Sequence, residues 1–516
     1  MKMKTVMEHQ FSEVPKATIE RSSFDRSHGV KTTFDAGYLV PILVDEALPG
    51  DTFNTNMTAF ARMATPIFPI MDNVYMDTHF FAVPVRLIWD NWKKFNGEQI
   101  DPGDSIDYTV PTMTAPGVGY SNQTLHDYFG IPTGVGNLEH NSLWHRAYNL
   151  IYNEWFRDQN LQDSVQVDKG DGPDTYTNYT LLKRGKRHDY FTSCLPWPQK
   201  GDAVDLPLGT TAAVATSAGT GDALAIYNTN TTSYEYLNTS GTPYVNSGGG
   251  TGTEARGLFA DLSTATSATI NQLREAFQIQ KLLERDARGG TRYTEIVKAH
   301  FGVTSPDARL QRPEYLGGGS TPINVTPIEQ TSSTDATSPQ GNLAAMATAS
   351  LTNHGFTKSF TEHCVILGLV SVRADLTYQQ GLNRMFSRQT RYDFYWPALS
   401  HIGEQAVLNK EIYADGTAAD DNVFGYQERY AEYRYKPSMI TGKFRSNDAQ
   451  SLDAWHLSQE FSSLPGLNST FIEENPPLDR VIAVPSEPHF IFDSYISMKC
   501  ARPMPVYSVP GKIDHF

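Results

Sequence analysis

An acid, a base and a nucleophile are consecutive in the sequence at Glu362, His363 and Cys364. They begin an apolar run, 363–373, whose composition predicts a buried strand. Because neighbouring side chains on a strand point to opposite faces of the sheet, these three residues could not act together on one substrate. We therefore interpret them as a core histidine and a buried thiol rather than as catalytic residues.

Motifs of catalytic and metal-binding proteins are otherwise missing. The sequence has no G-x-S-x-G, no G-x-x-x-x-G-K-[ST] and no H-E-x-x-H. The acidic run 168–174 could gather carboxylates around calcium, but it lacks the ligand spacing of a calcium loop, and a solvated turn is the preferred interpretation. The cysteines Cys194, Cys364 and Cys500 are far apart, so neither a disulfide framework nor a zinc site is expected. We expect no enzyme, no metal and no cofactor.

The densest positive patch is the string Lys183-Arg184-Gly185-Lys186-Arg187-His188, which is followed by Tyr190 and Phe191. Cations with adjacent aromatic rings suit single-stranded nucleic acid, because phosphates pair with the cations and bases stack on the rings. Lys183, Arg184, Lys186 and Arg187 are therefore candidate DNA contacts. A salt-bridged surface loop is the alternative, and such loops are common.

Overall charge argues against a protein held to nucleic acid by its whole surface. The chain of 516 residues has 42 Lys and Arg against 57 Asp and Glu, a net charge of −15. Binding of a polyanion by the chain must then be local. Charged residues are only 19% of the total, whereas Phe, Tyr and Trp make up 11%, which suits a protein that buries much of its surface against neighbours.

The composition changes most sharply in the stretch 207–267, which is dominated by Gly, Ser, Thr, Ala and Asn. No Lys or Arg occurs between residues 201 and 255. The stretch nevertheless contains Tyr227, Tyr234, Tyr236 and Tyr244. A plain linker has little use for tyrosine, so we interpret it as an exposed, partly β, projecting loop with the composition of a recognition surface.

Strand patterns dominate the rest of the chain, at both of its ends. Helical spacing or capping signals mark a few segments between them, and 316–340 is rich in Gly, Ser, Thr and Pro and predicts a loop. Strands at both ends with a very long middle favour a mainly β fold, an antiparallel jelly-roll barrel with long inter-strand insertions. The expected strands are 38–44, 52–57, 74–84, 363–373 and 490–500, and the expected helices are 85–97, 144–156, 269–289 and 293–301.

Several unusual strings resemble the major capsid proteins of microviruses, small tailless phages with single-stranded DNA, and specifically those of the gokushovirus branch. The resemblance extends from about residue 20 to the C-terminus, except for 207–267. It is carried by the segments His28–Pro41, Glu46–Phe53, His79–Trp92, Tyr148–Phe156, Leu195–Gln199, Gly290–Tyr293 and Pro313–Gly318.

The resemblance implies an eight-stranded antiparallel jelly roll that assembles into a T=1 icosahedral shell of 60 copies around circular single-stranded DNA. It also implies a small basic DNA-binding peptide, pilot and scaffolding proteins and a host surface receptor as partners. The place of the protein would be the virion, assembled in the host bacterial cytoplasm. In this branch the region that corresponds to 207–267 is the variable insertion thought to project at three-fold axes.

These inferences combine into one expected organisation: an N-terminal arm, 1–27, and a jelly-roll capsid domain, 28–516, that carries the insertion 207–267. The expected function is a structural major capsid protein whose insertion attaches to the host. For contacts between copies we single out 85–97 and the tyrosines Tyr426, Tyr430, Tyr433 and Tyr435. The alternative is a carbohydrate-binding or carbohydrate-cleaving β-sandwich surface protein, since 57 acids leave many carboxylate pairs.

Overall fold

The computed structural model describes the chain in several ranges and divides it into two compact units, Met1–Pro198 with Thr291–Phe516, and Gln199–Gly290. The described residues are 20–204, 213–216, 225–228, 233–238, 246–247, 258–261, 270–304, 311–332, 334–336 and 339–507, without the side chains of the short strands between 213 and 261. Antiparallel sheets dominate the first unit, so the prediction of a mainly β fold is confirmed.

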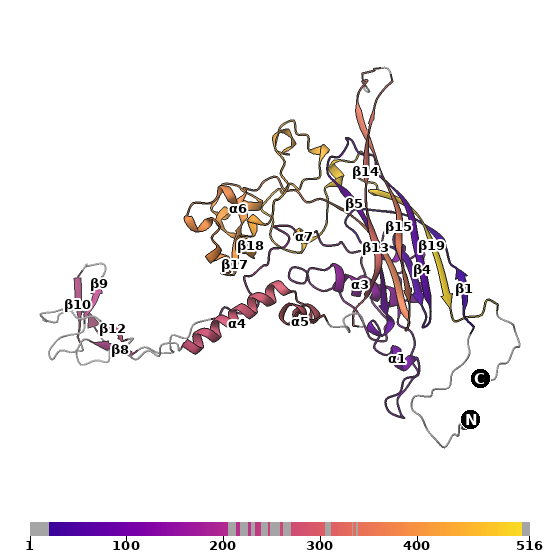
Figure 1. Cartoon of the computed structure of the whole chain (residues 1–516), viewed down its shortest axis with the longest axis horizontal. Helices are drawn as coiled ribbons and strands as arrows, with labels where there is room; N and C mark the ends of the chain where they lie inside the picture. The colour runs from indigo at the N-terminus through magenta and orange to yellow at the C-terminus, as the bar shows by residue number, and fades with distance from the viewer. Residues whose placement is uncertain are drawn as a thin grey trace. The chain divides into compact units, whose positions relative to one another are not determined.

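The first sheet of this unit joins strands from both ends of the chain, and Figure 1 shows its long strands side by side. Its order is β1-β19-β4-β15-β14, and β2 also pairs with β19. Buried and exposed residues alternate along β4, so one face of the sheet contacts the core. The strands are β1 (Ser22–Asp25), β2 (His28–Phe34), β4 (Thr52–Met63), β14 (Asn324–Glu329), β15 (Leu343–Ser359) and β19 (Phe490–Arg502).

The second sheet has the order β13-β5-β16-β3 and is also antiparallel throughout. Ten of the eleven residues of β16 are buried, because both faces of this sheet are covered. Cys364 begins β16, which confirms the buried strand expected at 363–373. The strands are β3 (Val40–Ala47), β5 (Val74–Pro84), β13 (Glu314–Pro322) and β16 (Cys364–Ala374).

The main core lies between the two sheets. Phe53 and Phe490 of the first sheet and Phe80 and Ile366 of the second belong to one cluster of buried side chains. A second cluster covers the opposite face of the second sheet, where Trp89 and Tyr148 pack on Phe81 and its neighbours. Burial of large apolar side chains on both faces is the main source of stability for such a sheet. The outer cover therefore fixes β5 and β16 between two apolar layers.

Most of the expected elements are present close to their predicted bounds. The helical spacing of 144–156 corresponds to α3 (Leu143–Ile151) and the π-helical turn η2 (Tyr152–Phe156). The segment 85–97 forms η1 (Val85–Leu87) and α1 (Trp92–Phe95). The helix α5 (Tyr293–Phe301) ends where Gly302 adopts a left-handed conformation, as the glycine signal predicts.

The prediction of a loop over 316–340 was wrong, because this stretch contributes β13 and β14. Its glycines are needed for close approach between strands rather than for turns. A Cβ atom on Gly317 would lie 2.5 Å from the carbonyl oxygen of Gly355 on β15, and one on Gly319 would lie 2.6 Å from the ring of His354. Glycine is the residue type that permits such contact.

Long insertions separate the strands of the two sheets. One of them carries the hairpin of β17 (Glu404–Leu408) and β18 (Val423–Glu428), which packs on a third apolar cluster around Phe191 and Phe424. The other short elements of the first unit are β6 (Thr112–Thr114), α2 (Leu125–Tyr128), β7 (Glu139–Asn141), α6 (Asn409–Ile412), α7 (Ser469–Ile472) and 3-10 turns, several of them in 384–480.

The second unit contains short antiparallel strands and one long helix. Strand β9 (Ala225–Asn228) pairs with β10 (Ser233–Asn238), which also pairs with β11 (Asn246–Ser247), and β8 (Ala213–Thr216) pairs with β12 (Leu258–Asp261). The helix α4 (Ile270–Gly289) matches the predicted helix 269–289, although Thr269, its expected cap, lies outside the described residues. The partly β character expected of 207–267 is thus present in the backbone.

Candidate nucleic-acid interface

The basic string lies in a segment that is fixed by backbone hydrogen bonds on both sides. Arg184 N–H donates to the carbonyl of Gly37, and Lys186 N–H donates to the carbonyl of Ile472. The carbonyl of Arg184 accepts from Glu474 N–H on the second side. The segment is therefore a rigid strap, which holds its side chains in fixed places without regular sheet structure.

Arg184 is part of a buried charge cluster. Its guanidinium lies 2.7 Å from Oδ2 of Asp77, and Arg373 lies 2.7 Å from the same oxygen. Burial alone would raise the pKa of Asp77, but a hydrogen bond from Ser320 and the charges of Arg184 and Arg373 outweigh it and lower the pKa. Two cations thus share the Asp77 carboxylate, and the charge of the buried Glu474 also acts on both of them.

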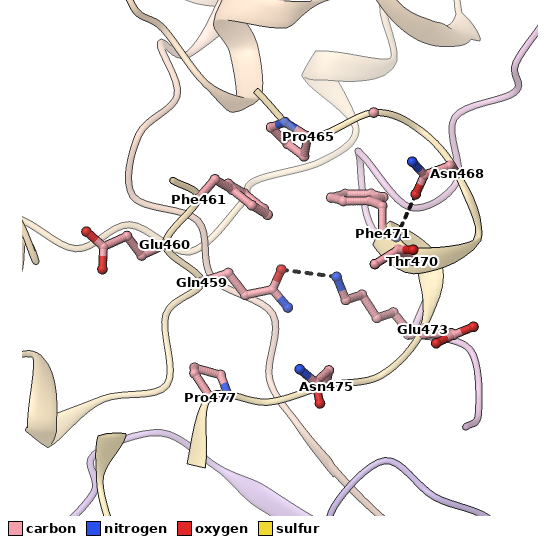
Figure 2. A pocket seen from close by; sticks show the side chains of 12 residues that line it. Gln459, Glu460, Phe461, Pro465, Asn468, Thr470, Phe471, Glu473, Asn475 and Pro477 are labelled. Atoms are coloured by element: carbon pink, nitrogen blue, oxygen red, sulfur yellow. Dashed lines mark hydrogen bonds between the residues drawn. The ribbon is translucent and has the colours of Figure 1, made fainter. Parts of the chain in front are cut away.

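Lys186 is also buried, and its ammonium has partners within the chain. Nζ donates to Oε1 of Gln459 at 3.0 Å and lies 4.5 Å from the centre of the Phe471 ring. Burial lowers the pKa of Lys186 to about 8. Lys186 lines a pocket of about 350 Å³. Gln459, Phe461 and Phe471, which Figure 2 labels, line the same pocket. Lys186 is thus held mainly as a structural cation.

Arg187 is the exposed cation of the string, and Lys183 is half-buried. Lys183 donates to Oδ1 of Asn475 at 2.8 Å and lies over the ring of Tyr38. Arg187 approaches Asp375 only to 3.9 Å, and its side chain is 58% exposed. A guanidinium with so loose an ion pair can bind a phosphate at little cost.

A cleft of about 740 Å³ lies beside the strap and collects cations from several parts of the chain. Its cationic lining comprises Arg184, Lys186 and Arg187 together with Arg157 and Arg292, against one carboxylate, that of Asp158. Arg292 is partly neutralised by Glu154 at 3.3 Å and Glu295 at 3.0 Å. The lining is therefore rich in cations, although Arg184, Arg187 and Arg292 each have a carboxylate partner just outside it.

Aromatic rings form the second half of the lining. Phe81, Trp155, Phe156 and Tyr315 all border the cleft, and the rings of Phe81 and Tyr315 are 5.4 Å apart. Arg312 places its guanidinium 4.1 Å from the centre of the Trp155 ring. Flat rings and stacked guanidiniums are surfaces on which nucleobases stack.

Two polar atoms of cleft residues have no hydrogen-bond partner among the described residues. They are Nε2 of His79 and Nε of Arg157. Burial, followed by the charge of Arg184, lowers the pKa of His79 to about 4, so its ring is neutral at pH 7. Such atoms could accept a further partner, although thirteen others occur elsewhere among the described residues.

The aromatic residues expected to assist the basic string are not those of the cleft. Tyr190 and Phe191 are buried in the third apolar cluster, where the hydroxyl of Tyr190 donates to Glu411. Trp155, Tyr315, Arg157 and Arg292 occupy the cleft instead. Sequence reasoning missed them because they are separated by up to 160 positions from one another and from the string.

The four tyrosines of the insertion are only partly described. Tyr227 and Tyr234 stand opposite each other in the register of β9 and β10, and Tyr236 shares β10 with Tyr234. Tyr244 lies outside the described residues.

The other chemical candidates are occupied by contacts within the chain. Glu362 binds Arg86 at 2.7 Å, His363 packs against Trp92, and burial raises the pKa of Cys364 to about 12. All three cysteines are described, and none forms a disulfide. In the acidic run, Asp171 accepts from Trp89 and Asp174 binds Arg146 at 2.7 Å.

A cluster of metal ligands and a membrane-spanning helix are both absent from the described residues. No group of three or more His, Cys, Asp or Glu there could hold a metal ion. In the same ranges no helix has the length and apolar character required to cross a membrane.

Comparison with known proteins decides the family. A family model described as "Capsid protein (F protein)" matches residues 12–512. The chain belongs to this family of phage capsid proteins. It is 52% identical to capsid protein VP1 of Bdellovibrio phage phiMH2K, with 99% of this chain and 98% of the relative covered.

Two further relatives are also named capsid protein VP1. That of Chlamydia phage 1 is 45% identical over 99% of this chain and 98% of its own length. The capsid protein VP1 of Spiroplasma virus 4 is 38% identical over 98% of this chain and 97% of its own length. All three relatives are capsid proteins of gokushovirus-type microviruses, which confirms the resemblance found in the sequence.

Family membership confirms three predictions. The protein is a structural capsid protein, it is not an enzyme, and it is part of the virion. A carbohydrate-binding or carbohydrate-cleaving surface protein finds no support among these relatives.

Proposed function

We propose that 60 copies of this protein form a T=1 icosahedral shell around circular single-stranded DNA, and that the basic cleft contacts the packaged strand. Membership in the capsid family supports the formation of a shell. The combination of cations, rings and unsatisfied polar atoms in one cleft supports the contact with DNA.

The shell-forming body is an eight-stranded jelly roll. Its eight strands are β2, β19, β4 and β15 of the first sheet and β13, β5, β16 and β3 of the second, and β1 and β14 extend the first sheet. In both sheets the neighbours are distant in sequence, as they are in two interleaved Greek keys. The close approach of Gly317 on β13 to Gly355 on β15 joins the two sheets along one edge.

The chain neutralises DNA phosphates only at the cleft, so the rest of the packaged strand needs other cations. Arg187 and Arg157 supply a small share of the positive charge at the cleft, while Arg184 and Lys186 hold the strap in place. Lys183 lies outside the cleft lining and would contact the strand beside it. The remainder comes from counterions and a small basic DNA-binding peptide, because a subunit of charge −15 repels a polyanion at long range. The cleft then faces the interior of the shell.

The insertion 207–267 acts in attachment to a receptor on the host surface. Its composition supports this role, because tyrosine presents a rigid amphipathic surface and Ser, Gly, Asn and Thr adapt around it. The separation of 199–290 as a compact unit is in keeping with a module that can vary without harm to the main core. Assembly in the host bacterial cytoplasm also involves pilot and scaffolding proteins.

A charge reversal tests the DNA contact. Particles with Arg187→Glu are expected to form in normal yield but to contain less DNA, measured as the ratio of absorbance at 260 and 280 nm. Lys31→Glu is the matched control, because Lys31 is an exposed cation on β2 of the other sheet. Equal DNA content in both variants and the wild type would show that the cleft does not bind the strand.

A further inference from the structure

An irregular part of the first unit exposes an unusual number of large apolar side chains. In the segment 382–402, Phe386 is 70% exposed and Tyr392 is 64% exposed, and Tyr433 and Met439 are exposed beside it. We call 382–402 together with 429–439 the aromatic surface. A continuous exposed apolar area of this kind marks an interaction site in a soluble protein.

Side-chain contacts make the aromatic surface one continuous patch. The ring of Tyr395 lies 5.2 Å from that of Tyr430 and 6.2 Å from that of Tyr433. Tyr430 itself is buried, and its hydroxyl donates to the carbonyl of Tyr392 at 3.2 Å. The two halves of the surface are thus fixed to each other before any partner binds, which reduces the entropy lost on association.

The residue types are those of a protein–protein interface. The segment 382–402 contains five Phe, Tyr and Trp residues, three Arg and one Met, but no Lys, no Glu and a single Asp. Interfaces are enriched in aromatic residues, Met and Arg, and are depleted in Lys, Glu and Asp. Trp, Tyr and Arg in particular carry most of the binding energy at measured interfaces.

A pocket at the edge of the surface could accept a side chain. It has a volume of about 380 Å³ and is lined by Leu382, Met385, Phe386, Tyr435 and Met439 among others. Dominant contacts of an interface commonly consist of an anchor side chain inserted into a pocket of this kind.

Charge indicates the chemistry of the partner. Arg391 and Arg429 form no ion pair with a carboxylate among the described residues, although each stacks on a ring, Trp396 and Tyr430 respectively. The partner must therefore supply acidic groups. A second copy of this chain, with a net charge of −15, does so.

Single-stranded DNA is the competing occupant, since it is also acidic. Exposed apolar side chains without rings disfavour it, because nucleobases gain little from contact with Met385, Met439 and Ile402. Contact of these side chains with apolar side chains of a protein is more favourable.

We propose that the aromatic surface is a contact between copies of this chain in the shell. The proposal rests on the proposed shell function and deepens it by naming the surface. At a three-fold or five-fold axis such a contact is heterologous, and the surface would bind a different region of the neighbouring copy, whereas at a two-fold axis it would meet the same surface.

The test is assembly of the full-length capsid protein in cells that supply the other phage proteins. The double variant Phe394→Ala/Trp396→Ala removes two exposed rings, and we expect about a tenfold or greater loss of particles, with subunits that unfold at the wild-type temperature. Ile100→Ala/Val118→Ala is the matched control, because these apolar side chains are exposed elsewhere in the first unit. The control is expected to assemble normally.

A second variant tests the same surface in case the double variant does not fold. Arg391→Ala leaves the rings in place and is expected to reduce particle yield. Purified Arg391→Ala particles are expected to differ more from the wild type in resistance to dissociation at low than at high salt. Normal yield for both variants, or normal yield with reduced DNA content, would overturn the proposal, the latter in favour of DNA as the occupant. Absence of particles from the wild-type chain would instead contradict the proposed shell function.

Discussion

Arg187 is the side chain on which the DNA contact depends most directly, because it is exposed and only loosely paired with Asp375. Removal of one phosphate contact lowers the slope of log K against log salt by about 0.7 for a single strand. We expect this change for Arg187→Ala in binding of purified subunits to oligo(dT), measured by fluorescence anisotropy. An unchanged slope, or the same change in Lys31→Ala, would contradict a contact at the cleft.

Three histidines make the first unit sensitive to acid. Nδ1 of His126 and Nε2 of His145 are 2.9 Å apart, and His140 lies beside them with its Nε2 2.9 Å from the hydroxyl of Tyr120. Burial lowers the pKa of all three, to about 4 for His126. The folded state therefore keeps them neutral, whereas the unfolded chain binds protons near pH 6.5.

Stability is expected to be fully present above pH 6.5 and to be lost as pH falls towards 4, by at most about 1.4 kcal/mol per pH unit for each histidine. Urea unfolding of the subunit at several pH values measures this slope. The variant His126→Gln/His145→Gln is expected to have a lower stability at pH 7 but a shallower dependence on pH. A variant as acid-sensitive as the wild type would show that other groups are responsible.

At the scale of elements, the glycines of β13 hold the two sheets of the first unit close together. A Cβ atom on Gly317 would meet the backbone of Gly355, which cannot move without distortion of β15. We expect Gly317→Ala to lower the free energy of unfolding by about 1–3 kcal/mol. Gly103→Ala is the matched control, because a Cβ atom there would have nothing within 4 Å and its φ is not in the left-handed region. Equal stability of Gly317→Ala and the wild type would exclude a tight contact.

These glycines also show where sequence patterns mislead. The stretch 316–340 has the composition of a loop, and only the neighbouring strand explains why glycine is required there. By contrast, 293–301 was predicted to its exact ends, because its stop signal at Gly302 is local. The strands at 74–84 and 363–373 were also clear, since burial on both faces gives a continuous apolar run.

The local part of the candidate site was predictable from the sequence, whereas the part formed by distant residues was not. The string 183–188 is consecutive and therefore visible, and its Arg187 is exposed as a phosphate contact requires. Trp155, Arg292 and Tyr315 come close to this string only in the folded chain. No spacing in the sequence predicts that they line the same cleft. Tyr430 was singled out as a contact between copies, but it is buried within the chain, where it supports Tyr395 and Tyr433.

On the scale of the whole molecule, the insertion should be separable from the shell. Deletion of residues 210–253 is expected to leave assembly largely intact and to abolish adsorption to the host, because the main core does not depend on this stretch. Adsorption of purified particles to host cells measures the effect. Phage that lack the stretch and still adsorb normally would refute the attachment role, and failure to assemble would show that the stretch is needed for contacts between copies.

The central claim is a closed shell of 60 identical chains around single-stranded DNA. Cryo-electron microscopy of purified particles tests it most directly. The expected result is a T=1 icosahedral particle with one 57.4-kDa chain in each asymmetric unit, a jelly roll in its wall, and density for nucleic acid against the cleft beside Arg187. Particles of another symmetry, or a shell in which that cleft opens to the exterior, would contradict the account.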